Sequence, residues 1–264
     1  MKGVFFVDYN YHTHTARCHH ATGTPEEYIQ NALEHGIRYM GFSEHLPFRF
    51  PDGSESDYRV STEEGKDYCV EICKLKEQYK DKMDLAVGFE MEYYAEYFDE
   101  MLQNAREYGA EYLILGQHFV RPENSKPAHY VLVECMLAKE LKAYTDAVIA
   151  GMETGVFTYV AHPDIFNFTG DSGFYRREMQ RLCKAAKKTD TPLEINCLGI
   201  REKRNYPANE FWAIAGEEQA PVTIGFDAHA PEVAYDGASL EVAMDMIERY
   251  GLHYIGRPTL KPLD

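Results

Sequence analysis

Short apolar runs alternate with longer amphipathic stretches along the whole chain, and this alternation limits the folds that the chain can adopt. The apolar runs have the length and residue types of buried strands, and each is followed by apolar residues at helical spacing. We predict seven strands, at residues 3–12, 38–42, 85–90, 112–116, 157–161, 193–196 and 222–226. Strands that alternate with crossover helices form a parallel sheet, and seven of them favour a closed or nearly closed α/β barrel over an open doubly wound sheet.

The absence of linkers between these segments indicates one continuous domain. No Ser/Gly-rich linker or low-complexity tract interrupts it, so we expect residues 1–264 to fold as a single unit. Two helix starts are legible, because TPEE at 24–27 and STEE at 61–64 each place a hydroxyl three residues before a glutamate, the pattern of a capping box. The first strand is not followed by GxGxxG, and no GxxxxGK[S/T] occurs, so neither a dinucleotide site nor a P-loop is supported.

Nearly every predicted strand ends in residue types that bind metal ions. The first strand ends in His12-Thr13-His14, and side chains separated by one residue in an extended segment project to the same side. The other candidates, at later strand ends or on the loop after the first, are His19, His20, Glu44, His45, Glu90, His118, His162, Asp164, Asp227 and His229. The carboxyl ends of barrel strands converge on one face, where these groups would be buried together. Without cations they would be left unpaired, and more than four ligands imply more than one divalent ion.

Charge and cysteine usage exclude several function classes. The 27 Lys and Arg against 43 Asp and Glu give a net charge of −16, which disfavours binding to nucleic acid or to an anionic membrane. No apolar run is long enough for a spanning helix, and the start of the chain does not resemble a signal peptide. The six cysteines lack CxxC spacing, so we expect reduced thiols in a cytoplasmic protein. Nothing in the sequence indicates an oligomeric state.

Seven segments, in this order along the chain, together resemble one known family. They are YHTH at 11–14, GFSEH at 41–45, GFEMEY at 88–93, GQH at 116–118, AHPD at 161–164, EIN at 194–196 and GFDAH at 225–229. The set resembles the polymerase and histidinol phosphatase (PHP) superfamily, in particular its histidinol-phosphate phosphatase branch, over nearly the whole chain. The resemblance implies a distorted (β/α)7 TIM-like barrel, with three divalent ions (zinc, iron or manganese) at the carboxyl ends of the strands.

The resemblance also implies which residues hold which ion. The first ion is expected on His12, His14, Glu90 and Asp227. Glu90 is expected to bridge to a second ion, held also by His118 and His162. The third is expected on His20, His45 and His229; His20 is preferred to His19 because it is eight residues after the first motif histidine. Glu90, Asp227 and His229 are the expected catalytic residues. Glu44, Glu92 and Asp164 are either carboxylates that orient ligand imidazoles or ordinary surface charges.

The function implied by the resemblance is hydrolysis of L-histidinol phosphate to L-histidinol and phosphate in histidine biosynthesis, by attack of a metal-bridging hydroxide. Arg201 and Arg204 follow the sixth strand as candidate substrate-binding residues; we expect Arg201 to contact the phosphate, and Arg204 to be salt-bridged at the surface. The loop at 47–60, with acidic side chains, is expected to cover the imidazole and ammonium ends of the substrate. Two alternatives are a PHP phosphoesterase acting on a nucleotide, sugar phosphate or phosphotyrosine, and a metal-binding subunit without catalytic activity.

Overall fold

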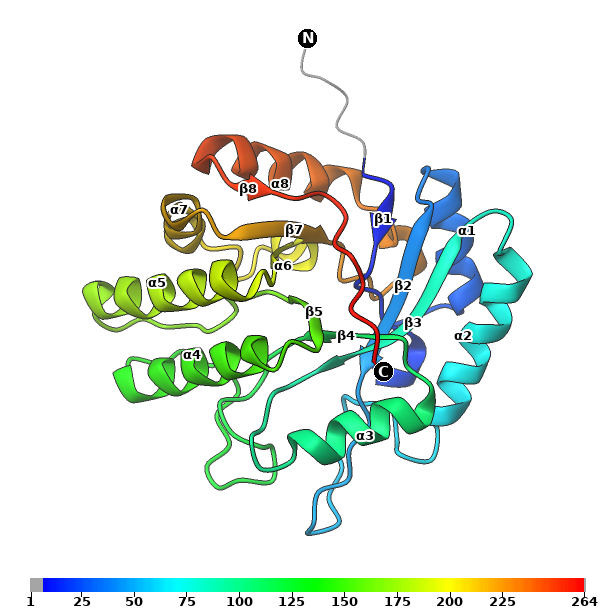
Figure 1. The fold of residues 1–264 in the computed structure, drawn as a ribbon, viewed down its shortest axis with the longest axis horizontal. Helices are drawn as coiled ribbons and strands as arrows, with labels where there is room; N and C mark the ends of the chain where they lie inside the picture. Colours follow the sequence, from blue (N-terminus) through cyan, green and yellow to red (C-terminus); the bar gives the residue numbers. More distant parts are fainter. Residues whose placement is uncertain (1–6, 264) are drawn as a thin grey trace.

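The computed structural model describes residues 7–263, which form one sheet of eight parallel strands surrounded by helices (Figure 1). Neighbouring strands in the sheet follow the order of the chain, from β1 to β8. The strands are β1 (Tyr9–Asn10), β2 (Tyr39–His45), β3 (Asp84–Met91), β4 (Tyr112–Leu115), β5 (Phe157–Val160), β6 (Leu193–Asn196), β7 (Pro221–Gly225) and β8 (His253–Tyr254). The helices are α1 (Pro25–Glu34), α2 (Gly65–Tyr79), α3 (Phe98–Tyr108), α4 (Ala138–Glu153), α5 (Ser172–Thr189), α6 (Cys197–Glu202), α7 (Asn209–Glu218) and α8 (Gly237–Tyr250), with short 3₁₀ turns η1 (Ala16–Cys18) and η2 (Pro231–Val233).

The predicted α/β barrel class is confirmed, with one more strand than the sequence suggested. All seven predicted segments contain a strand, although β1 is much shorter than predicted, and residues 3–6 of that prediction lie outside the described residues. The eighth strand was missed because β8 is only two residues long, too short for a pattern of apolar residues. It pairs with the amino-terminal half of β7.

The sheet closes at the carboxyl ends of its strands, between the extensions of β1 and β7. An isolated parallel bridge joins Thr13 to Ala228, with the His14 amide donating to the Ala228 carbonyl at 2.9 Å and the Ala228 amide donating to the His12 carbonyl at 3.1 Å. At the opposite end, β8 pairs with β7, and the Tyr9 hydroxyl of β1 lies 3.2 Å from the Tyr254 hydroxyl of β8 and 2.9 Å from the Thr223 hydroxyl of β7. The end that carries the predicted ligands is therefore closed by seven units, as the resemblance implied.

One of the two predicted capping boxes is present. At α1, the Thr24 side chain accepts a hydrogen bond from the Glu27 amide, and the Glu27 carboxylate accepts one from the Thr24 amide. The prediction for residues 61–64 is wrong, because α2 begins at Gly65 without a side-chain cap. The Ser61 hydroxyl instead donates to the Glu64 carboxylate at 2.6 Å.

The helices pack on the outer face of the sheet through apolar contacts that require close approach. Leu115 at the end of β4 is fully buried, and a Cβ on Gly151 of α4 would lie 2.7 Å from its Cδ2, so this leucine packs directly against the helix backbone. Trp212 of α7 is also fully buried, as a core residue. All six cysteines are free thiols. Across residues 7–263, no helix has both the length and the apolar character that crossing a membrane requires.

We expect Leu115→Ala to lower the free energy of unfolding by about 2–5 kcal/mol, because it leaves a cavity between β4 and α4. Leu137→Ala is the matched control, since that side chain is 54% exposed and its truncation should change stability by less than about 0.5 kcal/mol. Denaturant unfolding of both variants tests the packing. Equal losses in the two would contradict it.

Candidate metal centre

The strand pairing brings residues distant in sequence to one place at the carboxyl end of the sheet. His45 and Glu90 are register partners in the β2–β3 pair. The bridge between Thr13 and Ala228 places His12 and His14 beside Asp227 and His229. The remaining predicted ligands come from the loop after η1 and the loops that follow β4 and β5: His20, His118 and His162. The structure thus gathers all nine predicted metal ligands at one site.

Two of the predicted ligands have a backbone conformation that residues other than glycine rarely adopt. His162, two residues after β5, has φ of 31°, and Asp227, two residues after β7, has φ of 48°. Positive φ is costly for residues other than glycine and is concentrated at functional sites. The bend after each strand aims these side chains across the end of the sheet.

Glu90 occupies the middle of the cluster, and its two oxygens face different groups of imidazoles. Oε1 lies 2.9 Å from His162 Nε2 and 3.6 Å from His118 Nε2. Oε2 lies 3.2 Å from His45 Nδ1, and 3.6 Å and 3.5 Å from the Nε2 atoms of His12 and His14. A carboxylate with one oxygen toward each group has the geometry of a bridge between two ions, the role implied for Glu90.

Outer carboxylates hold three of the imidazoles by their Nδ1 atoms. His14 Nδ1 lies 3.1 Å from Glu44, and His118 Nδ1 lies 2.8 Å from Glu92, so for these two carboxylates the orienting role is the alternative that holds. His12 Nδ1 lies 2.8 Å from Glu194, a partner that the prediction missed. Its signal was available, because Glu194 belongs to the EIN segment at the end of the sixth strand. In each case the contact leaves Nε2 turned toward the cluster as a ligand atom.

Asp164 fits neither of the two alternatives given for it, since its side chain is buried and no described imidazole is its hydrogen-bond partner. Its carboxylate accepts a hydrogen bond from the Ala208 amide at 2.6 Å, and burial raises the pKa of Asp164 to about 7. His162, two residues earlier, is held instead through its backbone amide, which donates to Glu194 at 3.0 Å. Asp164 therefore anchors the segment before α7.

Many donor atoms of the cluster are buried without a hydrogen bond to any described residue. They are Nε2 of His12 and of His14, Nδ1 of His45 and of His162, both oxygens of Glu90, and Oδ1 of Asp227. Leaving so many polar atoms unpaired in the interior would cost several kcal/mol, so they require partners. Divalent cations suit these atoms, since imidazole nitrogen and carboxylate oxygen are the ligands of zinc, iron and manganese. The residues present fit a metal centre.

The donor groups of this centre overlap. One set with ligand atoms within 4.8 Å of one another is His14, His45 and His229; others combine His12 with His14 and Glu90, or with His162 and Asp227. Cys18 also approaches His20 and His229 within this limit, which the sequence did not suggest. The allocation of individual ligands to three ions stays a prediction.

The electrostatics of the cluster favour the metal-binding forms of Glu90 and His45, but without a cation they favour a protonated His12. Burial alone would raise the pKa of Glu90, but the His118 and His12 imidazoles outweigh it and hold that pKa well below its usual value. Burial and the neighbouring His14 lower the pKa of His45 well below its usual value. For His12, burial opposes protonation, but Asp227, Glu194 and Glu90 raise the pKa well above its usual value. Without a metal ion, a proton on His12 therefore balances the negative charge of these three carboxylates, and binding of a cation would displace it.

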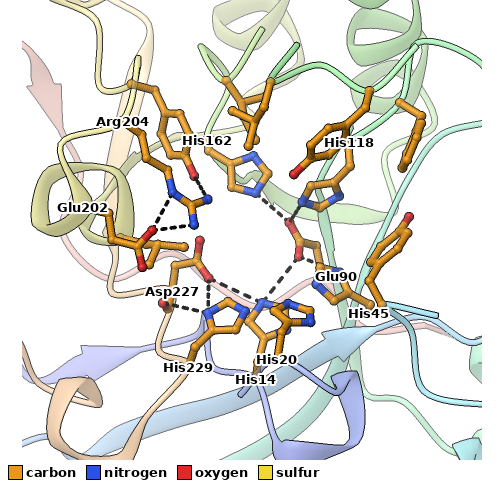
Figure 2. A pocket seen from close by; sticks show the side chains of 17 residues that line it. His14, His20, His45, Glu90, His118, His162, Glu202, Arg204, Asp227 and His229 are labelled. Carbon is orange, nitrogen blue, oxygen red and sulfur yellow. Dashed lines mark hydrogen bonds and ion pairs between the residues drawn. The ribbon is translucent and has the colours of Figure 1, made fainter. Parts of the chain in front are cut away.

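Eight of the nine predicted metal ligands, all except His12, line a pocket of about 540 Å3, the size of a small-molecule site. Arg204 and Glu202 lie across the pocket from His118 (Figure 2). Arg204 Nε and Nη2 contact the Glu202 carboxylate at 2.8 Å and 2.6 Å, and Nη1 donates to the Tyr206 hydroxyl at 3.0 Å. The rest of the wall is aromatic and aliphatic: Tyr58, Phe119, Tyr130, Leu132, Ile165, Leu198 and Tyr206.

The structure places the two arginines differently from expectation with respect to the pocket. Arg201 is not among the described residues that line the pocket; its Nη1 contacts Asp236 at 2.9 Å, and its Nη2 donates to the Asp227 carbonyl at 3.4 Å. Arg204, which we expected at the surface, faces the pocket. Both follow the sixth strand, but Arg201 lies in the last turn of α6, whereas Arg204 lies just after the helix ends.

The loop at 47–60 also differs from expectation, because Tyr58 is its only described residue in the pocket wall. Phe48 and Phe50 are buried and pack on Tyr97, and Glu55 binds Arg49 and Thr62. The segment after β4 supplies more of the wall, through Phe119, Tyr130 and Leu132.

Comparison with known proteins identifies the family. A family model described as the PHP domain matches residues 10–197. The chain belongs to the PHP family. The matched range contains every predicted metal ligand of this PHP domain except Asp227 and His229, which follow β7.

Relatives of this PHP protein match along most of its length. A probable histidinol-phosphatase of Deinococcus radiodurans is 27% identical over 83% of this chain and 85% of its own. The histidinol-phosphatase of Bacillus subtilis is 26% identical over 85% of this chain and 94% of its own. Among solved structures, histidinol phosphate phosphatase from Lactococcus lactis, complexed with zinc, L-histidinol and phosphate, has a TM-score of 0.70 at 20% identity and covers 94% of this chain and 95% of its own. That likeness confirms the distorted barrel fold.

Two glycines make room for the buried carboxylates of this PHP site. A Cβ on Gly116 would lie 1.9 Å from Glu90 Oε1, and one on Gly225 would lie 1.8 Å from Glu194 Oε1. Neither distance is tolerable for a real side chain. The glycine in each motif is therefore required by the carboxylate beside it.

We expect Gly116→Ala to displace Glu90 and to weaken metal binding about 10- to 100-fold. Elemental analysis after dialysis against a fixed free-metal concentration measures the loss. Gly173→Ala is the control, because a Cβ there would meet nothing closer than 3.4 Å. Full metal retention in Gly116→Ala would contradict the proposed position of Glu90 in the metal centre.

Proposed function

We propose that this protein is a metal-dependent phosphomonoesterase that hydrolyses L-histidinol phosphate to L-histidinol and phosphate, a step of histidine biosynthesis, in the cytoplasm. The observation that carries this proposal is the combination of a complete donor set with relatives named histidinol-phosphatase that match along most of both chains. The L. lactis structure supports it, since that protein holds L-histidinol and phosphate.

The donor set has the charge balance that an anionic substrate requires. Only two of its nine members, Glu90 and Asp227, are carboxylates, and the other seven are imidazoles, so three bound divalent ions would leave the floor of the pocket strongly positive. Those ions would supply an activated water and the charge that stabilises the attacking and leaving oxygens at phosphorus. Glu90, Asp227 and His229 contribute to catalysis by holding them in place.

The pocket wall provides recognition of the two ends of the substrate. The Arg204 guanidinium faces the metal ligands and is fixed by Glu202 and Tyr206, so it is oriented to bind phosphate oxygens. The Glu202 carboxylate beside it offers an anionic partner to the ammonium group of histidinol. The aromatic and aliphatic wall gives the imidazole and carbon chain an apolar surface and keeps water away from the phosphate.

We expect the purified protein to release phosphate from L-histidinol phosphate with a kcat/KM about 100-fold or more above that for a nucleotide, a sugar phosphate, phosphotyrosine or p-nitrophenyl phosphate. Chelation should abolish turnover, and added Mn²⁺ or Zn²⁺ should restore it, because only bound divalent ions would supply the activated water and the positive charge that the reaction at phosphorus requires. Equal rates on all five substrates would remove the substrate assignment and favour a different phosphomonoester.

Arg204→Met and Arg201→Met form a matched pair for the phosphate contact. Loss of a charged hydrogen bond to phosphate should lower kcat/KM about 10- to 100-fold in Arg204→Met. Arg201→Met should stay within about threefold of the parent, since Arg201 lies outside the pocket lining, pairs with Asp236, and reaches Asp227 only through a long 3.4 Å contact with its carbonyl. Steady-state kinetics on L-histidinol phosphate distinguishes them, and the opposite ranking would restore Arg201 as the phosphate ligand.

A further inference from the structure

A buried arginine lies behind the pocket wall, outside the donor set. The side chain of Arg59 is 1% exposed and comes from the end of the loop at 47–60. Its Nη1 donates to the Leu46 carbonyl at 2.9 Å, which fixes the loop to the end of β2. Its other donors contact two carboxylates from different segments, Glu92 after β3 and Glu123 after β4.

The first contact leads directly to a metal ligand. Arg59 Nη2 lies 2.5 Å from Glu92 Oε2, while the other oxygen of Glu92 lies 2.8 Å from His118 Nδ1. Glu92 is thus held on one side by the guanidinium and holds the imidazole on the other. Because Nδ1 of His118 is engaged in this way, its Nε2 atom is turned toward Glu90, at 3.6 Å from Oε1.

The second contact leads to the pocket wall. Arg59 Nη2 and Nε lie 2.5 Å and 3.1 Å from Glu123 Oε1, and the same oxygen accepts a 2.5 Å hydrogen bond from the Tyr58 hydroxyl. The Tyr58 hydroxyl also lies 3.2 Å from Glu92 Oε1, so it touches both carboxylates. The Tyr58 ring stacks on Phe119 with centroids 6.1 Å apart. Both rings line the pocket, so the two loops that form this wall are joined through Arg59 and Glu123.

No other residue type could replace Arg59 between Glu92 and Glu123 without loss of charge or of hydrogen bonds. Glu92 and Glu123 are both nearly buried, and Arg59 is the only lysine or arginine among the described residues that pairs with either of them. Removing one partner of a buried ion pair leaves an uncompensated charge, which is far costlier than losing a surface pair. A lysine would keep the charge but has no planar fork with which to reach both carboxylates and the Leu46 carbonyl.

We propose that Arg59 is a positioning residue that couples the metal centre to the substrate pocket: through Glu92 it orients His118, and through Glu123 and Tyr58 it holds the wall of the pocket. The pocket arm rests on the proposed function, whereas the metal arm does not depend on the substrate. A substitution of Glu123 should therefore change substrate affinity, a substitution of Glu92 should change metal affinity, and a substitution of Arg59 should change both.

The metal arm is tested by binding alone. Arg59→Met and Glu92→Gln should each weaken binding of one ion about 10- to 100-fold, and Arg59→Lys should fall between them and the parent. Equilibrium dialysis against buffered Zn²⁺, followed by elemental analysis, measures ions per chain. Arg49→Met is the control, since Arg49 lies in the same loop but is 51% exposed and pairs only with Glu55 and Glu63 among the described residues.

The pocket arm is tested by kinetics on metal-saturated protein. Glu123→Gln keeps Glu92 and His118 in place, so metal content and kcat should be retained while KM for L-histidinol phosphate rises about 10-fold. Arg59→Met should change both metal affinity and KM. A merely structural role for Arg59 predicts parallel losses in all variants in proportion to their thermal stability, without this split.

Folding is controlled by thermal unfolding of each variant. If Arg59→Met does not fold, the double variant Arg59→Met/Glu123→Gln is used in its place, together with Arg59→Lys. The double variant removes one of the two carboxylate charges that Arg59→Met leaves unpaired. Folded variants that bind all ions with parental affinity and an unchanged KM would overturn the proposal. If metal affinity falls but L-histidinol phosphate is no substrate, the metal arm stands and the proposed function fails, so the two failures are distinguishable.

Discussion

The carboxylate of Glu90 lies in the interior of the protein, within 3.6 Å of five imidazoles, and both its oxygens lack a hydrogen bond to any described residue. A charge buried in this way is stable only beside cations, and the imidazoles around it have unpaired nitrogen atoms of their own. Ions between these groups satisfy both requirements at once. The rest of the site is arranged to keep this one carboxylate where cations reach it from two sides.

The supports of Glu90 extend outward in a consistent order. Gly116 leaves the space that its side chain occupies, and His45 is placed beside it by the register of β2 and β3. Around the imidazoles, Glu44, Glu92 and Glu194 bind Nδ1 atoms and turn Nε2 inward. Beyond them, Arg59 neutralises Glu92 and joins it to the loops of the pocket wall. The positions of these donor atoms thus depend on residues several contacts away from them.

Much of the centre could be predicted from the sequence because its ligands belong to strand ends. His12 and His14 share a side of an extended segment, and the ends of parallel strands converge whatever the helices do. The failures concern residues whose direction depends on long-range contacts. Asp164 follows β5 as closely as the ligands do, yet binds the Ala208 amide, and Arg201 turns to Asp236 while Arg204 turns to the pocket. Strand β8 was missed because two residues contain no period.

The sequence by itself determined the class of fold and the family, and it located the nine residues that the structure gathers at one site as predicted metal ligands, since these follow from periodicity and from short motifs in fixed order. Only the tertiary structure decided which arginine faces the pocket, which loops form the pocket wall and which carboxylates hold the imidazoles. Those choices depend on contacts such as Arg59 with Glu123 and His12 with Glu194, whose partners are far apart in the chain. Local spacing predicts the direction of a side chain on a strand, but on a loop that direction is fixed by whatever partner the folded chain brings near.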